Sequence, residues 1–152
     1  MSSESGFWKA VRAQLSPFGK LERIENRLGE GMGDVVYCLK RKPFMAAGSG
    51  FIELKECEWP KRATTTFHIP SYTKEQLDFA EGWASAGGRV HLFARVGKDY
   101  LLWPVKHMRP IFERQYTSAQ AQAAASVRWR TPSPWPLAEI LDQLAGYENV
   151  NK

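Results

Sequence analysis

Four short apolar segments, two on each side of one amphipathic helix, restrict what this chain can fold into. The segments are rich in β-branched and aromatic residues, as β-strands are. We expect strands at 34–39, 50–55, 89–96 and 100–105, and the helix at 73–86. A turn separates the members of each pair, so each pair should form a hairpin. This order predicts an α/β fold in which a central mixed β-sheet is flanked by helices.

The helix at 73–86 has the clearest local signals. Thr73 is a favourable N-cap, and Gln76 follows it at the distance that a capping box requires. The apolar side chains of this helix form one stripe, made of Leu77, Ala80, Trp83 and Ala84. Further helices are expected at 7–15, 119–126 and 137–147. A short helical segment that carries the acidic residue Glu25 is expected at 21–28. The stretches 56–71 and 128–136 are expected to be irregular.

The length of 152 residues fits one domain, since domains usually have about 100–200 residues. We expect a main domain at 1–110 and a C-terminal extension at 111–152. The extension has an irregular Pro/Trp stretch and a final helix, which should pack on the same domain or on a partner subunit. Its Trp129 and Trp135 could stack on a nucleic-acid base, but aromatics in such a stretch more often pin it to its own domain or to a second subunit.

Charge and cysteine content favour some classes of partner and site over others. The net charge of +5 and the pI near 9.3 suit a polyanionic partner, because basic residues set against phosphates release counterions. Cys38 and Cys57 lack the spacing of a zinc site. No apolar run approaches the roughly 18 residues of a membrane span, and the N-terminus lacks the apolar core of a signal peptide. We therefore expect a cytoplasmic protein with no membrane partner.

The chemistry-bearing residues lie on the first pair of strands. Asp34 opens a strand directly after a glycine-rich turn. On the next strand, alternation places Glu53 and Lys55 on one face and Leu54 on the other. Because hairpin strands lie roughly 5 Å apart, Asp34 and Glu53 could converge on one hard cation, to which the backbone carbonyl of Leu54 could add an oxygen.

Phosphodiester hydrolysis requires an arrangement of this kind. A metal lowers the pKa of a bound water and neutralises the charge that grows on the phosphate. Lys55 could orient that water and stabilise the transition state. The alternative is an ordinary half-exposed strand with alternating charges, since a D…ExK pattern also arises by chance.

Basic residues near these strands in the sequence could contact phosphates, which would position a nucleic acid without reading its sequence. These residues are Lys40, Arg41, Lys42, Lys61, Arg62 and His68. The alternative is that they belong to solvated loops. His91 and His107 are expected to be structural.

Four stretches, taken as a set, carry a family resemblance: RIENRLGEGMGDVVYC, GFIELK, TKEQLDF and AGGRVHLFARVG. They resemble the VRR-NUC-like nucleases, small phage and prophage enzymes of the PD-(D/E)XK superfamily related to Holliday-junction resolvases. The resemblance covers about residues 21–102. One departure is Gly33 before Asp34, where the family has a proline that shapes the turn and contributes no chemistry.

The resemblance implies a restriction-endonuclease-like fold with Asp34 and Glu53 as ligands of Mg²⁺ or Mn²⁺ and Lys55 as the catalytic lysine. Glu25 matches the acid of the family's N-terminal helix, and Gln76 matches the glutamine of its following helix. Gln76 could equally serve only as the capping-box partner of Thr73.

The sequence therefore favours a divalent-metal-dependent endonuclease that cuts structured or branched DNA in a bacterial host cytoplasm, encoded by a phage or prophage. A homodimer would supply two sites for two strands. The alternatives are a DNA-binding protein that does not cut, and a phage–host interaction protein on the same scaffold.

Overall fold

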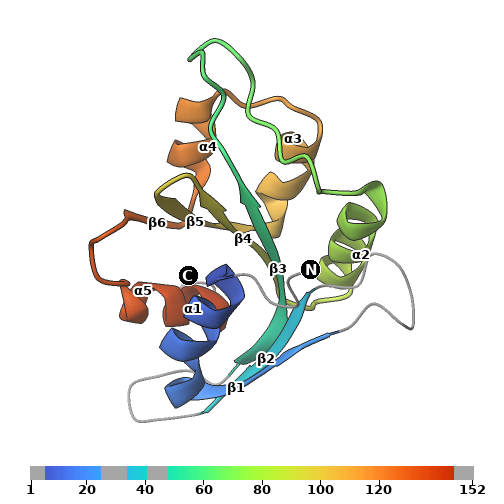
Figure 1. Ribbon diagram of the computed structural model, residues 1–152. Helices are drawn as coiled ribbons and strands as arrows, with labels where there is room; N and C mark the ends of the chain where they lie inside the picture. Colours follow the sequence, from blue (N-terminus) through green and yellow to red (C-terminus); the bar gives the residue numbers. More distant parts are fainter. Residues whose placement is uncertain (1–5, 25–33, 41–47, 146–152) are drawn as a thin grey trace.

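The computed structural model describes residues 6–24, 34–40 and 48–145, and a six-stranded mixed sheet forms its centre (Figure 1). The strands follow one another across the sheet in chain order. They are β1 (Gly19–Arg23), β2 (Val35–Leu39), β3 (Gly48–Cys57), β4 (Val90–Val96), β5 (Asp99–Pro104) and β6 (Val127–Arg130). Neighbouring strands are antiparallel except β3 and β4, which are parallel. The expected α/β fold with a central mixed sheet is confirmed.

Helices cover both faces of the sheet (Figure 1). One face packs against α1 (Gly6–Leu15) and α5 (Leu137–Ala145), which share a single apolar cluster with it. The other face packs against α2 (Lys74–Ser85), α3 (Met108–Phe112) and α4 (Ser118–Ala124). The parallel pairing of β3 with β4 needs a long crossover, and α2 lies in that crossover. Two 3₁₀ turns, Ser16–Phe18 and Val105–His107, complete the regular structure of the described residues.

Alternation along β3 assigns its side chains to the two faces as expected. Ile52 and Leu54 pack in the cluster under α1 and α5. Phe51 and Cys57 pack in the cluster under α2, α3 and α4. Glu53 and Lys55 lie between Phe51 and Cys57 in this alternation, so they belong to the α2 face.

At the two edge strands the structure differs from the sequence-based assignment. β1 lies where we expected a short helical segment, and β6 lies where we expected irregular structure. Each edge strand has one buried residue, Leu21 in β1 and Val127 in β6, so neither shows the apolar alternation typical of a strand. Pairing with β2 and with β5 makes them strands. Helix α3 was not expected, and β3 begins at Gly48 instead of Gly50.

The described part of the C-terminal extension packs on the same sheet as the rest of the chain. β6 pairs with β5, and α5 joins α1 in one apolar cluster. The ring of Trp129 stacks on Tyr100 with centroids 5.2 Å apart, and Trp135 lies 5.1 Å from both of these rings. Both tryptophans therefore pack against residues of their own chain. No helix among the described residues is long and apolar enough to cross a membrane.

Candidate functional site

The register of the β2–β3 hairpin brings Asp34 and Glu53 together. Val35 pairs with Ile52, and one further step along both antiparallel strands places Asp34 opposite Glu53. The carbonyl of Asp34 accepts a hydrogen bond from the backbone N–H of Ile24 at 2.7 Å, which continues the β1–β2 ladder through this residue. Its side-chain Oδ2 accepts a bond from the backbone N–H of Leu54 at 3.0 Å. The carboxylate of Asp34 is thus anchored against β3.

Glu53 is a buried acid, only 2% exposed. Burial raises its pKa to about 9, and the charge of Asp34 and a hydrogen bond between the two carboxyl groups act in the same direction, whereas Lys55 opposes the rise. Its Oε2 has no hydrogen-bond partner within the described part of the chain. Glu53 is therefore protonated at neutral pH unless a bound cation replaces the proton.

Lys55 is held next to this pair. Its side chain is 6% exposed, and its ammonium Nζ lies 3.4 Å from Oε2 of Glu53. The same Nζ donates a hydrogen bond to the carbonyl of Ser71 at 2.9 Å. The segment that leads into α2 thus fixes the position of the ammonium group. The three residues expected to form one site do lie together.

Tyr72 is a fourth member of this site, and sequence reasoning missed it. Its ring centroid lies 5.9 Å from Nζ of Lys55, and the ring packs edge-to-face with Phe112 at a centroid distance of 5.6 Å. Its hydroxyl is buried with no hydrogen-bond partner among the described residues. Burial, followed by the charges of Glu53 and Glu81, raises its pKa. The available sequence signal was an aromatic directly before an N-cap, a position that often packs against the first turn of the helix.

Gln76 takes part in a capping box. Its Oε1 accepts a bond from the backbone N–H of Thr73 at 2.9 Å, while Thr73 Oγ1 accepts one from the backbone N–H of Gln76 at 3.2 Å. The capping interpretation is confirmed, and a catalytic role for Gln76 stays a prediction. Leu54 contributes its N–H to Asp34, and its carbonyl as a metal ligand stays a prediction. Glu25 lies outside the described residues.

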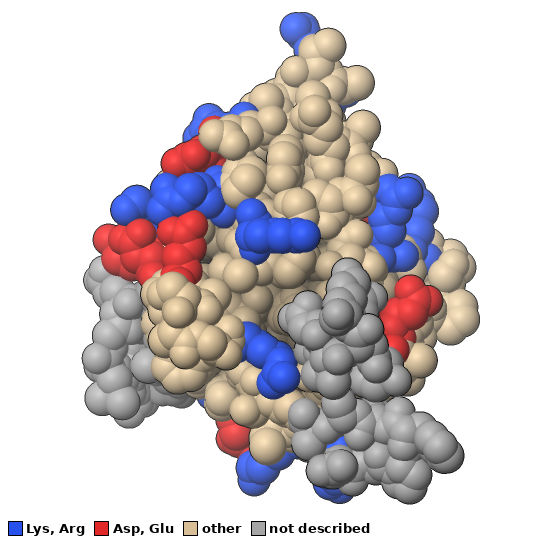
Figure 2. All heavy atoms as spheres, turned by 180° about the vertical axis from the view of Figure 1, so that it is seen from behind, with Lys and Arg blue, Asp and Glu red and all other residues tan. Residues whose placement is uncertain are grey.

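Those of the expected phosphate-contacting residues that the structure describes lie on different segments. Lys40 is exposed at the end of β2, and Lys61 and Arg62 are exposed in the segment after β3. Figure 2 shows basic side chains at separate positions on one face of the molecule, among them the tip of its protruding end. His68 contacts Arg114 at 3.3 Å, and burial together with this arginine lowers its pKa. Arg41 and Lys42 lie outside the described residues.

His91 and His107 behave as expected for structural residues. His91 is buried and pairs with Ile52 in the β3–β4 register, so it lies on the sheet face opposite Glu53. His107 bonds to the hydroxyl of Tyr116 at 2.8 Å.

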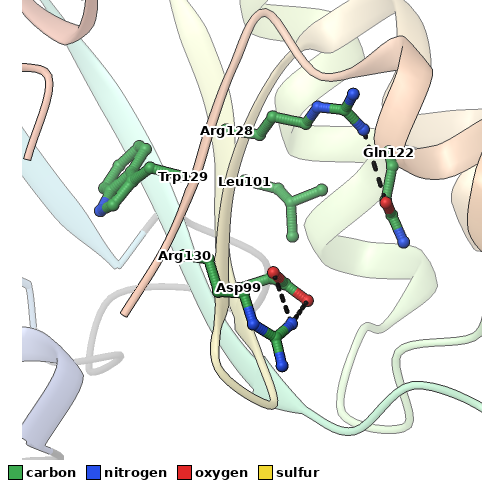
Figure 3. A pocket seen from close by; sticks show the side chains of 6 residues that line it. All are labelled: Asp99, Leu101, Gln122, Arg128, Trp129 and Arg130. Atoms are coloured by element: carbon green, nitrogen blue, oxygen red, sulfur yellow. Dashed lines mark hydrogen bonds and ion pairs between the residues drawn. The ribbon is translucent and has the colours of Figure 1, made fainter. Parts of the chain in front are cut away.

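A hollow of about 280 Å³ lies away from this site, between β5, β6 and α4 (Figure 3). Its charged groups are largely occupied with each other. Asp99 accepts bonds from Arg130 at 3.0 Å and from the indole N–H of Trp59 at 2.7 Å. Arg128 reaches Gln122 at 3.4 Å. This hollow contains no paired carboxylates, so it cannot perform the chemistry available at Glu53.

The carboxylate pair is suited to a hard divalent cation. Within the described ranges, no group of three or more His, Cys, Asp and Glu side chains is placed to hold a metal ion, so two carboxylates would have to be completed by backbone oxygens or water. The buried Oε2 of Glu53 has no hydrogen-bond partner there, and the negative charge of Asp34 opposes ionisation of Glu53. A bound cation would coordinate the Glu53 oxygen that lacks a hydrogen-bond partner, and it would offset the repulsion between the two carboxylates. The residues present therefore fit a divalent cation.

A comparison of the sequence with protein-family models and with curated proteins finds no match.

Proposed function

We propose that this protein is a divalent-metal-dependent endonuclease that hydrolyses phosphodiester bonds of DNA. The observation that supports this best is the grouping on one sheet face of Asp34, buried Glu53 and the ammonium of Lys55, 3.4 Å from the Glu53 carboxylate. The resemblance to VRR-NUC-like nucleases adds DNA as the substrate and a restriction-endonuclease-like arrangement to the proposal. It also adds a phage or prophage origin and a bacterial host cytoplasm.

The position of each residue in the site gives it a separate role in the proposed reaction. Asp34 and Glu53 would hold Mg²⁺ or Mn²⁺, which when bound lowers the pKa of water and offsets the charge of the phosphate. Glu53 must release its proton to bind a cation, so metal affinity should rise with pH. Lys55 keeps its ammonium directed at the site through its bond to the Ser71 carbonyl, where it can stabilise negative charge on the phosphate or on the attacking water.

A cleavage screen tests this proposal. Duplex, flap and four-way DNA are incubated with Mn²⁺ or Mg²⁺ and either the wild type or Lys55→Ala. We expect the wild type to cut at least one form and Lys55→Ala to lose about 100-fold or more in rate, the usual effect of removing a transition-state charge partner. Asp34→Asn and Glu53→Gln should lose cleavage activity to a similar extent as Lys55→Ala. Glu56→Gln is the matched control, because Glu56 is exposed on the same strand with its side chain on the opposite face.

Other outcomes point to the alternatives. Metal-independent DNA binding without cleavage of any form would replace the nuclease by a DNA-binding protein. A stable complex with a host protein and no affinity for DNA would indicate an interaction protein. Full activity of Lys55→Ala would remove the proposed site.

A further inference from the structure

Three aromatic side chains form a cluster beside the carboxylate pair. Phe51 on β3 meets Phe79 and Trp83 on α2, with ring centroids 5.1 and 4.8 Å away and interplanar angles of 89°. Phe79 and Trp83 are nearly parallel, at 19° with centroids 5.9 Å apart. We call Phe51, Phe79 and Trp83 the aromatic platform.

The platform exposes an indole to solvent. Trp83 is 43% exposed, and among the described residues it is the large hydrophobic side chain that the fold leaves at the surface. By contrast, the tryptophans considered from the sequence for base stacking, Trp129 and Trp135, are partly buried and pack against the apolar cluster under α1 and α5. Contact between water and an aromatic surface of this size is unfavourable. Stacking of another flat apolar surface on the indole would remove that surface from water and so favour binding.

The exposed indole is also held in place. Phe51 and Phe79 pack against it, and a backbone hydrogen bond from the N–H of Gly88 to the carbonyl of Trp83 at 2.9 Å closes the end of α2 beside it. A Cβ at position 88 would collide with the indole ring, so only glycine leaves room for it there. A ring fixed in this way loses little conformational entropy when a ligand stacks on it.

The platform adjoins the proposed catalytic site. Phe51 and Glu53 are two residues apart on the same face of β3, which separates them by roughly 7 Å along the strand. Phe51 pairs with Val36 across the β2–β3 hairpin, and Asp34 lies two residues before Val36. Along one sheet face the order is therefore aromatic platform, carboxylate pair, Lys55.

We propose that the aromatic platform binds an unpaired nucleobase of the nucleic-acid substrate next to the bond that is cut. This inference rests on the proposed function and deepens it by naming the substrate class. The adjoining phosphodiester site and the net charge of +5 favour a nucleic acid over an apolar protein partner. Bases in a duplex present their faces to each other, so only unpaired bases are free to stack on a protein ring. The preferred substrates are thus DNA forms with single-stranded segments beside the cleavage point.

Binding measured by fluorescence anisotropy tests the platform without requiring cleavage. The probes are a labelled single-stranded oligothymidine and a sugar–phosphate chain of equal length that lacks bases. All proteins have the Lys55→Ala background, which prevents cleavage. We expect Trp83→Ala to weaken oligothymidine binding about 10-fold, the effect of losing one stacked base. Trp83→Tyr should remain close to the parent, and Trp83→Leu, which keeps apolar contact but cannot stack, should resemble Trp83→Ala.

Binding to the base-free chain shows whether Trp83 contacts the bases or the sugar–phosphate backbone. None of the Trp83 variants should differ in binding it, and the parent should bind it about as weakly as Trp83→Ala binds oligothymidine. Equal weakening on both chains, or no weakening on oligothymidine, would overturn the inference. If the wild type cuts no DNA but Trp83 still discriminates between the two probes, the nuclease proposal fails and base binding stands. If it cuts DNA and Trp83 has no effect, the reverse holds.

Discussion

Replacing Glu53 with Gln tests the electrostatics of the carboxylate pair directly. Burial and the nearby Asp34 raise the pKa of Glu53 from 4.5 to about 9, so the folded protein keeps a proton that the unfolded chain releases above about pH 4.5. A group whose pKa is raised by folding stabilises the fold below its unfolded pKa, and this contribution is lost as the pH rises to the folded pKa. Gln has a similar shape and does not titrate, so Glu53→Gln should lack this loss.

The expected size follows from the width of the pH interval. From pH 5.5 to 7.5 the unfolded glutamate is ionised while folded Glu53 stays protonated. Each pH unit then corresponds to about 1.4 kcal/mol. Over this interval the wild type should lose about 3 kcal/mol in free energy of unfolding relative to Glu53→Gln. Millimolar Mn²⁺ should restore much of this stability in the wild type, because the cation binds the ionised carboxylates of the folded state.

Urea denaturation followed by far-UV circular dichroism at several pH values measures this difference. Glu56→Gln is the control, because Glu56 is exposed on the same strand and its curve should run parallel to that of the wild type. Parallel pH dependence of the wild type and Glu53→Gln would refute the reasoning, since it would mean that Glu53 ionises in the folded protein as it does in water. A response of Glu53→Gln to Mn²⁺ equal to that of the wild type would remove Glu53 as a metal ligand.

Three further predictions concern residues outside the carboxylate pair. Burial and Arg89 lower the pKa of His91 to about 4, so stability should fall as the pH drops from 6.5 to 4, and His91→Gln should flatten this acid limb in the same denaturation series. Trp135→Ala should cost about 2–4 kcal/mol of unfolding free energy without changing DNA affinity, and a loss near zero would contradict its packing role. Gln76→Ala should cost about 0.5–1 kcal/mol through the capping box while cleavage continues; a collapse of cleavage with the fold intact would instead assign Gln76 a role in the reaction.

Local signals explain which elements could be predicted. β2, β4 and β5 are short and nearly continuous apolar runs, and α2 has apolar residues at helical spacing and begins with its capping box. These signals lie within a few residues of each other, so they can be recognised without knowledge of the remaining chain. β1 and β6 lack them, because an edge strand with one buried residue is stabilised mainly by pairing with its neighbour.

The sequence by itself determined the mixed α/β sheet and the alternation that puts Glu53 and Lys55 on one face of β3. Only the tertiary structure decided that Asp34 lies opposite Glu53, that Glu53 is buried deeply enough to hold a proton, and that Tyr72 joins the site. It also decided which of these tryptophans is exposed, because Trp83 is exposed whereas Trp129 and Trp135 are partly buried against the core. The physical reason is that alternation is a property of a single strand, whereas register and burial depend on contacts between residues distant in the chain.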